Sequence, residues 1–239
     1  GLYADTLHDD GVLSDYRGQN ANMHICEAMI SAYEATNNPK FLERAKTIAD
    51  NICNKQAALT QGLIWEHFTD TFQPDWEYNK DDAKNLYRPW GFQPGHQTEW
   101  AKLLLQINRH APQAWLVTKA KALFDISFDK AWDGEHGGLI YGFDPEGNWC
   151  DDDKYFWVQA ESFAAAALLY KATNEQKYLN SYQSLWQYSW QHFVDHKYGA
   201  WFRVLHRDNS KYSNEKSAAG AKCDYHTLGA CFEVLHSIA

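Results

Sequence analysis

Apolar and polar positions along this chain alternate with the period of α-helices, and the helices that they predict come in pairs. The first helix of a pair is the less polar: 160–169 is small and apolar nearly all round, whereas 41–46 alternates apolar with charged residues. A helix of the first kind is expected to be buried between other helices, and one of the second kind to cover them. The pattern therefore predicts an inner and an outer layer of helices, with pairs at 20–36 and 39–57, at 96–109 and 113–131, and at 156–173 and 175–194, and with helix 223–237 unpaired.

An internal repeat supports this organisation. Residues 33–42 read Tyr-Glu-Ala-Thr-Asn-Asn-Pro-Lys-Phe-Leu, and residues 170–179 read Tyr-Lys-Ala-Thr-Asn-Glu-Gln-Lys-Tyr-Leu. In both segments a helix of small residues ends, a short turn with asparagine follows, and a second helix begins. Repeats of this kind are typical of units that bury their apolar faces only against their neighbours.

The segments between the pairs carry strand-like pieces and turns. Residues 137–143, followed by Asp-Pro-Glu-Gly-Asn at 144–148, predict a β-hairpin, and 198–204 resembles its first strand. Two helical layers with hairpins in the loops describe an all-α fold, an α/α barrel, in one domain over 1–239. Seven helices do not close such a barrel, and 1–17 resembles a connecting loop. We therefore expect the C-terminal portion of a longer barrel, with its remaining helices outside these residues or a second copy covering the bare helix faces.

The composition excludes several classes of protein. The chain is 45% apolar with a mean hydropathy of −0.61, and no run approaches the ~18 apolar residues of a membrane helix. Its net charge of −9 disfavours nucleic-acid binding, which needs a basic face. The 11 Trp, 14 Tyr and 12 Phe can pack a core, and aromatic faces also stack on sugar rings. Five cysteines, an odd number without metal-ligand spacing, predict reduced thiols and a reducing compartment such as the cytoplasm.

The pattern His-x-x-Glu occurs twice, at His24–Glu27 and at His96–Glu99, and His226 begins the last predicted helix. An i, i+3 spacing puts histidine and glutamate on one helix face, and histidine is the side chain best placed to exchange protons near neutral pH. If these helices line one cavity, several imidazoles meet there beside carboxylates, as in a proton-transfer site. His96 lies at a helix N-terminus, where the dipole favours the neutral imidazole that a general base requires.

Other polar side chains could take part at such a cavity. Asn20 shares a helix face with His24, and together they make a hydroxyl-binding pair. Glu99, one turn after His96, could orient that imidazole or hold a substrate hydroxyl.

Three further residues offer contacts to a polar, hydroxyl-rich molecule. Trp157 and Glu161, at i and i+4, supply a stacking surface and a polar anchor, and Arg88 is the nearest cation before His96. Each of these candidates also fits a structural role, as a helix cap, a core residue or a solvated helix position.

Metal binding is an alternative use of the two His-x-x-Glu helices, since carboxylate bundles use a related spacing. Helices of successive pairs need not touch, however, so we expect no metal and no other cofactor. The run Asp151–Asp153 lacks the glycine and the final glutamate of a calcium loop and predicts a solvated turn. The remaining histidines are expected in loops or outer helices, most of them without a part in the chemistry: His8, His67, His110, His136, His192, His196, His206 and His236.

Four segments resemble the N-acylglucosamine 2-epimerase superfamily, in family order along the whole chain. They read Arg-Gly-Gln-Asn-Ala-Asn-Met-His at 17–24, Pro-Gly-His-Gln-Thr-Glu-Trp-Ala-Lys-Leu-Leu at 94–104, Trp-Val-Gln-Ala-Glu at 157–161 and Asp-Tyr-His at 224–226. The second segment is most similar to the bacterial mannose and sulfoquinovose isomerases. The family fold is an (α/α)6 barrel, so the resemblance implies an incomplete barrel here. It also implies that part of the barrel, with a substrate-binding arginine, precedes Gly1.

The resemblance assigns His96 and His226 to two acid/base roles, and it places in the sugar site Asn20, His24, Arg88, Glu99 and Trp157. It implies proton transfer at C2 of a mannose-like monosaccharide through a cis-enediol, without a cofactor, giving a ketose. The alternatives are a 2-epimerase of N-acylglucosamine or a related sugar, and a non-catalytic sugar- or protein-binding barrel. A monomer or homodimer without nucleic-acid or membrane partners is expected.

Overall fold

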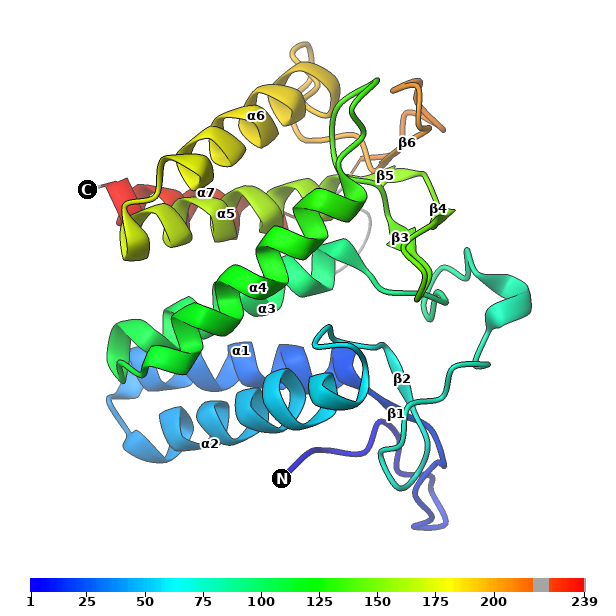
Figure 1. Cartoon of the computed structure of the whole chain (residues 1–239), viewed down its shortest axis with the longest axis vertical. Coiled ribbons are helices and arrows are strands. Elements are labelled where there is room, and N and C mark those ends of the chain that lie inside the picture. The colour runs from blue at the N-terminus through cyan, green and yellow to red at the C-terminus, as the bar shows by residue number, and fades with distance from the viewer. Residues whose placement is uncertain (217–223, 239) are drawn as a thin grey trace.

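The computed structural model describes residues 1–216 and 224–238. Within them, helices alternate with short antiparallel strands and irregular loops (Figure 1). The α-helices are α1 (Gln19–Thr36), α2 (Pro39–Ala49), α3 (Pro94–His110), α4 (Ala114–Ala131), α5 (Phe156–Thr173), α6 (Gln176–His192) and α7 (Tyr225–Ile238). These bounds confirm the predicted helices, with one exception at the end of α2. Cys223, at the predicted start of the last helix, lies outside the described residues.

The second helix does not continue as an α-helix to residue 57. It changes into a π-helical segment, η1 (Asp50–Gln56), and then into a short 3₁₀ turn, η2 (Ala57–Leu59). The side chain of Asn51 donates a hydrogen bond to the carbonyl of Thr47 at 2.7 Å. Asparagine side chains compete in this way for the helix's own hydrogen-bonding groups. The apolar periodicity continues through the segment, so the sequence pattern did not reveal the change.

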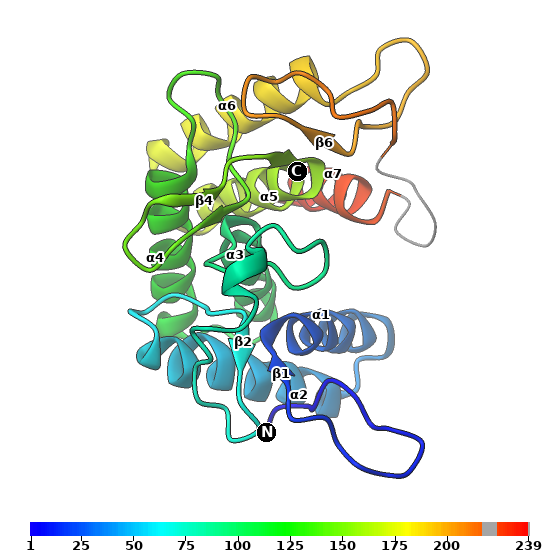
Figure 2. The ribbon, with the colours of Figure 1, turned by 90° about the vertical axis from the view of Figure 1, so that its right-hand side faces the viewer.

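Helices α1, α3, α5 and α7 form an inner layer, and α2, α4 and α6 form an outer one. Figure 2 shows the inner helices in an open arc, with the outer helices on its convex side. The two middle inner helices are the most buried: 13 of the 18 residues of α5 and 13 of the 17 of α3 are buried, against 5 of the 18 of α1, 6 of the 18 of α4 and 4 of the 17 of α6. An arc of helix pairs is the architecture that the hydrophobic pattern predicts.

The internal repeat is visible in the backbone. Helices α1 and α5 both end at an asparagine in the left-handed conformation, Asn37 with φ 55° and Asn174 with φ 57°. The backbone N–H of each donates to the carbonyl of the tyrosine four residues earlier, at 2.7 Å. Asparagine is the residue other than glycine that most readily ends a helix in this way. Both outer helices therefore leave their inner partners through the same turn.

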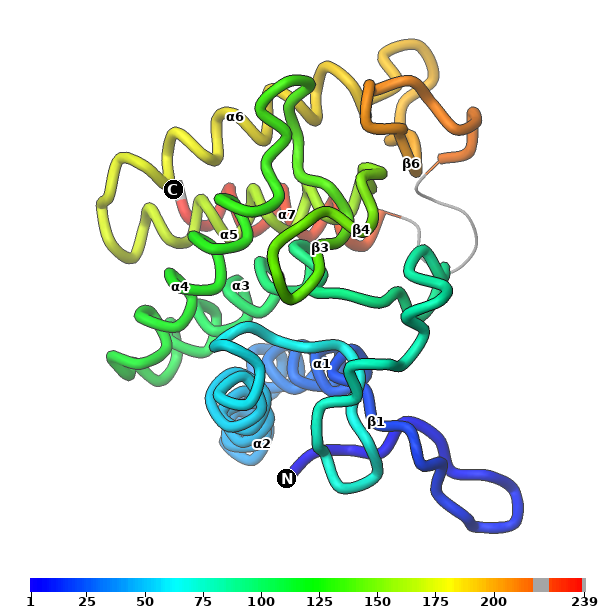
Figure 3. Tube along the Cα trace, turned by 45° about the vertical axis from the view of Figure 1, so that its right-hand side comes forward, coloured from blue at the N-terminus to red at the C-terminus, as the bar shows by residue number. Residues whose placement is uncertain are grey.

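The strands lie at one end of the arc. They form three antiparallel pairs, β1 (Arg17–Gly18) with β2 (His67–Phe68), β3 (Gly142–Phe143) with β4 (Trp149–Asp151), and β5 (Lys154–Tyr155) with β6 (Val204–Leu205). The predicted hairpin is confirmed, because β3 and β4 pair across the turn at 144–148. Figures 1 and 3 show these pairs and their loops gathered at the end where the inner helices begin.

One face of α7 is uncovered, as the pattern predicts. Tyr225, Leu228, Phe232 and Leu235 follow one another along this face, and these residues are between 48% and 68% exposed.

In residues 1–216 and 224–238, no helix combines the length and the apolarity that crossing a bilayer would need.

Candidate active site

A cavity of about 460 Å³ opens at the end of the arc where the inner helices begin. Small-molecule sites are typically about 300–1,000 Å³. Seven of the residues proposed from the sequence line this cavity: Asn20, His24, Arg88, His96, Glu99, Trp157 and His226. Further lining residues are Tyr16, Glu66, His67, Leu86, Tyr87, Pro89, Tyr141, Tyr155, Phe156 and Arg203. The fold therefore brings the three histidines singled out from the sequence to one concave site.

Each inner helix presents its first turn to this cavity. Asn20, Trp157 and His226 are the second residues of α1, α5 and α7, and His96 is the third residue of α3. In the described residues, the N-cap residues of α1, α3 and α5 (Gly18, Gln93 and Tyr155) make no capping hydrogen bond with their side chains. The positive ends of the helix dipoles therefore surround the cavity and favour negative charge on a bound molecule.

The His96 imidazole is paired with a buried carboxylate. Its Nδ1 lies 2.9 Å from Oε2 of Glu66, which also accepts a hydrogen bond from Gln19 Nε2 at 2.8 Å. A carboxylate at Nδ1 favours a proton on that nitrogen and leaves Nε2 as the basic one. Of the two roles considered for Glu99, orienting His96 is therefore taken by Glu66, and holding a substrate hydroxyl stays a prediction. The imidazole turns toward β2, whereas Glu99 turns toward groups of α1 and α5.

The His226 imidazole is paired in the same way. Its Nδ1 lies 2.7 Å from Oε1 of Glu161, a residue that is 1% exposed. Glu161 was expected to be a polar anchor for the substrate. It does not line the cavity but lies behind His226, so its direct contacts are with that histidine and with Lys102.

The Trp157 indole lies between the two imidazoles. Its ring centroid is 5.0 Å from that of His96 and 5.6 Å from that of His226, with interplanar angles of 34° and 35°. A Cβ atom at Gly95 would lie 2.5 Å from the indole, so a glycine at this position is what lets the ring approach α3. The indole gives the cavity an apolar face between two groups that can exchange protons.

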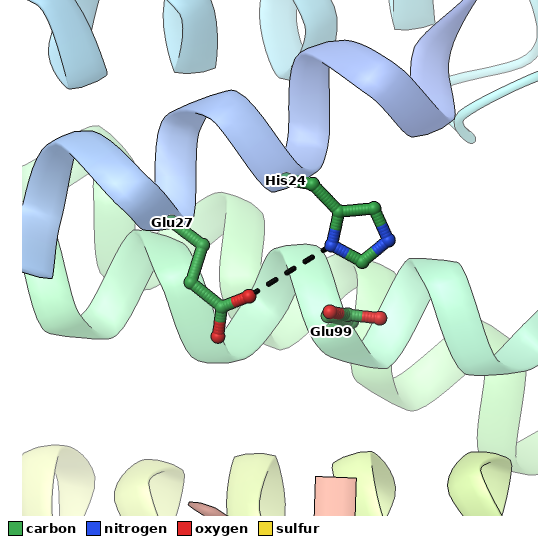
Figure 4. Close-up of side chains that lie close together, drawn as sticks. All are labelled: His24, Glu27 and Glu99. Atoms are coloured by element: carbon green, nitrogen blue, oxygen red, sulfur yellow. Dashed lines mark ion pairs between the residues drawn. The ribbon is translucent and has the colours of Figure 1, made fainter. Parts of the chain in front are cut away.

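The third histidine lies beside two carboxyl groups (Figure 4). His24 Nδ1 is 3.9 Å from Glu27 Oε2, and Glu99 lies close to both. The two His-x-x-Glu helices were not expected to touch, but here their side chains meet. Glu99 is fully buried, and neither of its oxygens has a hydrogen-bond partner in the part of the chain that the structure describes. Burial and the nearby Glu161 carboxylate raise the pKa of Glu99 well above its usual range, which favours a carboxyl that donates a hydrogen bond.

In the described residues three groups of side chains could offer three ligand atoms to a metal ion, Asp151–Asp153 and two groups at the cavity that share Glu99. The two at the cavity are His24, Glu27 and Glu99, and Glu99, Glu161 and His226, with ligand atoms within 4.8 Å of one another. The ammonium of Lys102 already lies 3.1 Å from Glu27 Oε1 and 2.6 Å from Glu161 Oε2. A second cation at either group would meet this positive charge. Metal independence therefore stays a prediction.

The aspartate run is not the solvated turn that the sequence predicted. Asp151 and Asp153 are 2% and 7% exposed. Lys84, from a distant loop, lies 3.2–3.3 Å from a carboxylate oxygen of each of the three aspartates and offsets part of their negative charge. Burial nevertheless raises the pKa of Asp151 to about 6. The prediction failed because the partner lies far away in the sequence.

Arg88 is held at the cavity by Tyr16 and Tyr78. His67, which was expected to be incidental, holds Tyr16 in turn. The guanidinium carbon of Arg88 lies 3.9 Å from the centre of the Tyr16 ring, and Nη1 donates to the Tyr78 hydroxyl at 2.7 Å. His67 lies between Tyr16 and Pro89: its Nε2 donates to the Pro89 carbonyl at 2.8 Å, so its Nδ1 accepts from the Tyr16 hydroxyl at 3.0 Å. Burial lowers the pKa of His67, which keeps it neutral in this role.

Among the residues at or behind the site that the sequence analysis missed, Glu66, His67 and Lys102 make the buried polar contacts described above. A weak signal preceded the first two, because the apolar run 63–65 is followed directly by two ionisable residues outside any helix. Lys102 lies between the apolar residues Trp100 and Ala101 and the run Leu103–Leu105 of an inner helix. A charge in an inner helix needs a buried partner, so it could have been recognised.

Comparison with known proteins gives consistent matches. A family model described as N-acylglucosamine 2-epimerase matches residues 1–230. A D-mannose isomerase of Marinomonas mediterranea is 59% identical over 100% of this chain and 61% of its own, and one of Thermobifida fusca is 35% identical over 80% of this chain and 47% of its own. A crystal structure of a D-mannose isomerase superposes with a TM-score of 0.96 at 58% identity, covering 99% of this chain and 61% of the other. The chain therefore spans less than two thirds of these relatives, and the likeness confirms the (α/α)6-barrel fold, of which the described helices form part.

Proposed function

The chain belongs to the N-acylglucosamine 2-epimerase family, and we propose that the whole protein isomerises a mannose-like aldose to the corresponding ketose. One observation carries the proposal: two imidazoles, each backed by a buried carboxylate, flank one indole in a single cavity. A pair of positioned proton carriers is what proton transfer between neighbouring carbons requires.

The reaction begins with the open-chain sugar in the cavity. One histidine removes the proton from C2, and the electron pair forms a C1–C2 double bond while the C1 carbonyl oxygen gains a proton. The product of this step is a cis-enediol. The hydroxyl at C2 then loses its proton as C1 gains one, which gives the ketose. His96 and His226 supply the base and the acid in our proposal, and the helix N-termini around the cavity stabilise the negative charge that develops on oxygen.

The other cavity residues bind and orient the sugar. We assign hydroxyl contacts to Asn20, His24, Arg88 and Glu99, and stacking on the carbon face of the sugar to Trp157. Glu161 acts through His226. The substrate is a monosaccharide, and we place the protein in the cytoplasm as a single α/α-barrel domain over 1–239 that needs no cofactor.

Incubation of the whole protein with mannose, fructose, glucose and N-acetylmannosamine, followed by NMR of the products, tests the function. We expect mannose and fructose to interconvert. Conversion of N-acetylmannosamine to its C2 epimer instead would favour the alternative of a 2-epimerase, in which the proton returns to the opposite face of C2. No conversion of any of the four sugars would contradict the proposal and favour a binding module.

Activity is expected to survive removal of divalent metals. After chelator treatment, the reaction run in deuterated water should proceed at an unchanged rate and carry deuterium into the product, because an enediol exchanges the transferred proton with solvent. A hydride shift between C1 and C2 would need a metal ion and would leave the carbon-bound hydrogen unexchanged. Loss of activity that added metal restores, without deuterium in the product, is the result that contradicts the proposed mechanism.

A further inference from the structure

Lys102 is a fully enclosed charge behind the cavity. The residue is 5% exposed, lies one turn after Glu99 on α3, and does not line the cavity. An ammonium group taken out of water is costly unless it is closely paired. Its two close partners are Glu161 of α5, at 2.6 Å, and Glu27 of α1, at 3.1 Å, so one lysine joins three inner helices.

Each of the two carboxylates contacts Lys102 through one oxygen and faces a histidine with the other. Glu161 gives Oε2 to Lys102 and Oε1 to His226 Nδ1, 2.7 Å away. Oε1 of Glu27 pairs with Lys102. Its Oε2 lies 3.9 Å from His24 Nδ1 and also accepts a hydrogen bond from the Tyr225 hydroxyl. Lys102 is thus linked through these carboxylates to two cavity histidines, His226 and His24, one on each side of α3.

A comparison with Glu99 shows what the ammonium does. All three carboxyl groups are removed from water, which by itself raises a carboxyl pKa. The pKa of Glu99, which makes no close contact with a cation, is raised far above its usual range. Although burial opposes the shift, Lys102 and the adjacent histidines hold the pKa of Glu27 and of Glu161 below the usual range. For Glu161 the ammonium of Lys102 is the largest of the effects that lower the pKa, whereas for Glu27 the hydrogen bond with His24 is larger.

We propose that Lys102 is a positioning residue of this site: by keeping Glu161 ionised, it fixes the proton of His226 on Nδ1 and leaves Nε2 free to act in the cavity. A neutral Glu161 would donate its own proton to Nδ1, and the ring would then carry its proton on Nε2, the opposite tautomer. The same ammonium contributes to keeping Glu27 ionised beside His24. The inference rests on the proposed function only for its kinetic consequence, since the position of a proton is measurable without turnover.

The test is Lys102→Met in the whole protein, a change that keeps length and apolar packing but removes the charge. Nitrogen NMR of ¹⁵N-histidine-labelled protein reports which nitrogen of His226 carries the proton. We expect the proton to move from Nδ1 to Nε2, and kcat to fall by about ten- to hundredfold, a part of the 10²–10⁴ that a positioned acid or base supplies. KM should change little because Lys102 does not line the cavity. Lys102→Arg, which keeps the charge, should restore the wild-type NMR signature.

Lys154→Met is the matched control. Lys154 is the other fully buried lysine in the part of the chain that the structure describes, and its ammonium lies 3.1 Å from the buried Asp133, outside the cavity lining. Its loss removes a buried ion pair of the same kind, but the proton of His226 should remain on Nδ1. If the ¹⁵N NMR signature of His226 changes in this variant as well, the effect of removing Lys102 is explained by a general loss of stability, and the proposal is overturned.

Two further outcomes test the role proposed for Lys102. A folded Lys102→Met variant with the wild-type His226 signature would overturn the inference whatever its activity. If that variant does not fold, carbon NMR of the wild type gives the answer: Glu161 must be ionised and His226 must carry its proton on Nδ1 at neutral pH, and a neutral Glu161 refutes the proposal. A wild type that converts none of the sugars removes the proposed function but leaves these NMR results interpretable.

Discussion

Replacing either His96 or His226 by alanine is expected to lower kcat by about 10²–10⁴-fold while the protein stays folded. Each imidazole has its Nδ1 bound to a buried carboxylate and its ring edge at the cavity, so each is placed to move one proton of the reaction. Alanine removes the proton carrier and leaves the carboxylate behind it. The measurement is steady-state conversion of the sugar that the product screen identifies, with circular dichroism to verify the fold.

His110→Ala is a suitable control for His96→Ala because both residues lie on α3. His110 is the last residue of that helix and pairs with Glu34 at 2.8 Å, far from the helix N-terminus that faces the cavity. Its replacement should leave kcat unchanged. The two active-site changes are expected not to add, because the acid and the base act in one proton transfer. A rate close to wild type in either single variant would remove that histidine from its assigned role.

The exchange Glu66→Gln is expected to lower kcat by on the order of 10²–10⁴-fold, with a smaller effect on KM. The carboxylate at His96 Nδ1 holds the ring in the tautomer whose Nε2 is basic, and it stabilises the imidazolium that forms when the proton is taken up. In the Ser-His-Asp triad the corresponding change from carboxylate to amide costs about 10⁴-fold. Glutamine keeps the size of the side chain and can still bind Gln19, so the loss reports charge rather than packing.

The exposed Glu77 supplies the control for this change. It pairs with Lys80 in η3 (Lys80–Asp82), and Glu77→Gln should alter neither kcat nor the pH dependence of turnover. An unchanged kcat in Glu66→Gln would show that His96 does not need the carboxylate and would contradict its assignment as a proton carrier of the reaction.

The sequence was sufficient for the helices, which follow from periodicity, and for seven of the 17 residues that line the cavity. Histidine and asparagine at the predicted start of an inner helix could be recognised as candidates, as Asn20, His96 and His226 were. Which side chains pair with one another was harder to predict. An i, i+3 spacing puts Glu99 on the same helix face as His96, but it does not determine which neighbouring helix each side chain meets.

The partners that were missed come from segments without regular periodicity or from distant helices. Glu66 and His67 follow a short run between helices, and their position depends on pairing of β2 with β1. Lys84 reaches Asp151, the last residue of β4, and the two aspartates after it from an irregular loop, which no local pattern could reveal. Such contacts are fixed by tertiary structure, since the chain must first fold before these charges lie close together.

The meeting of four inner-helix N-termini at one cavity has a consequence for how such a scaffold can diversify. The field of these helices is produced by backbone peptide groups, which no side-chain substitution removes. Stabilisation of charge on a sugar oxygen is thus a permanent property of the architecture, whereas the choice of sugar, and the face on which a proton returns, depend on exchangeable side chains. A protein built in this way can change its specificity through single substitutions without first losing its catalytic power.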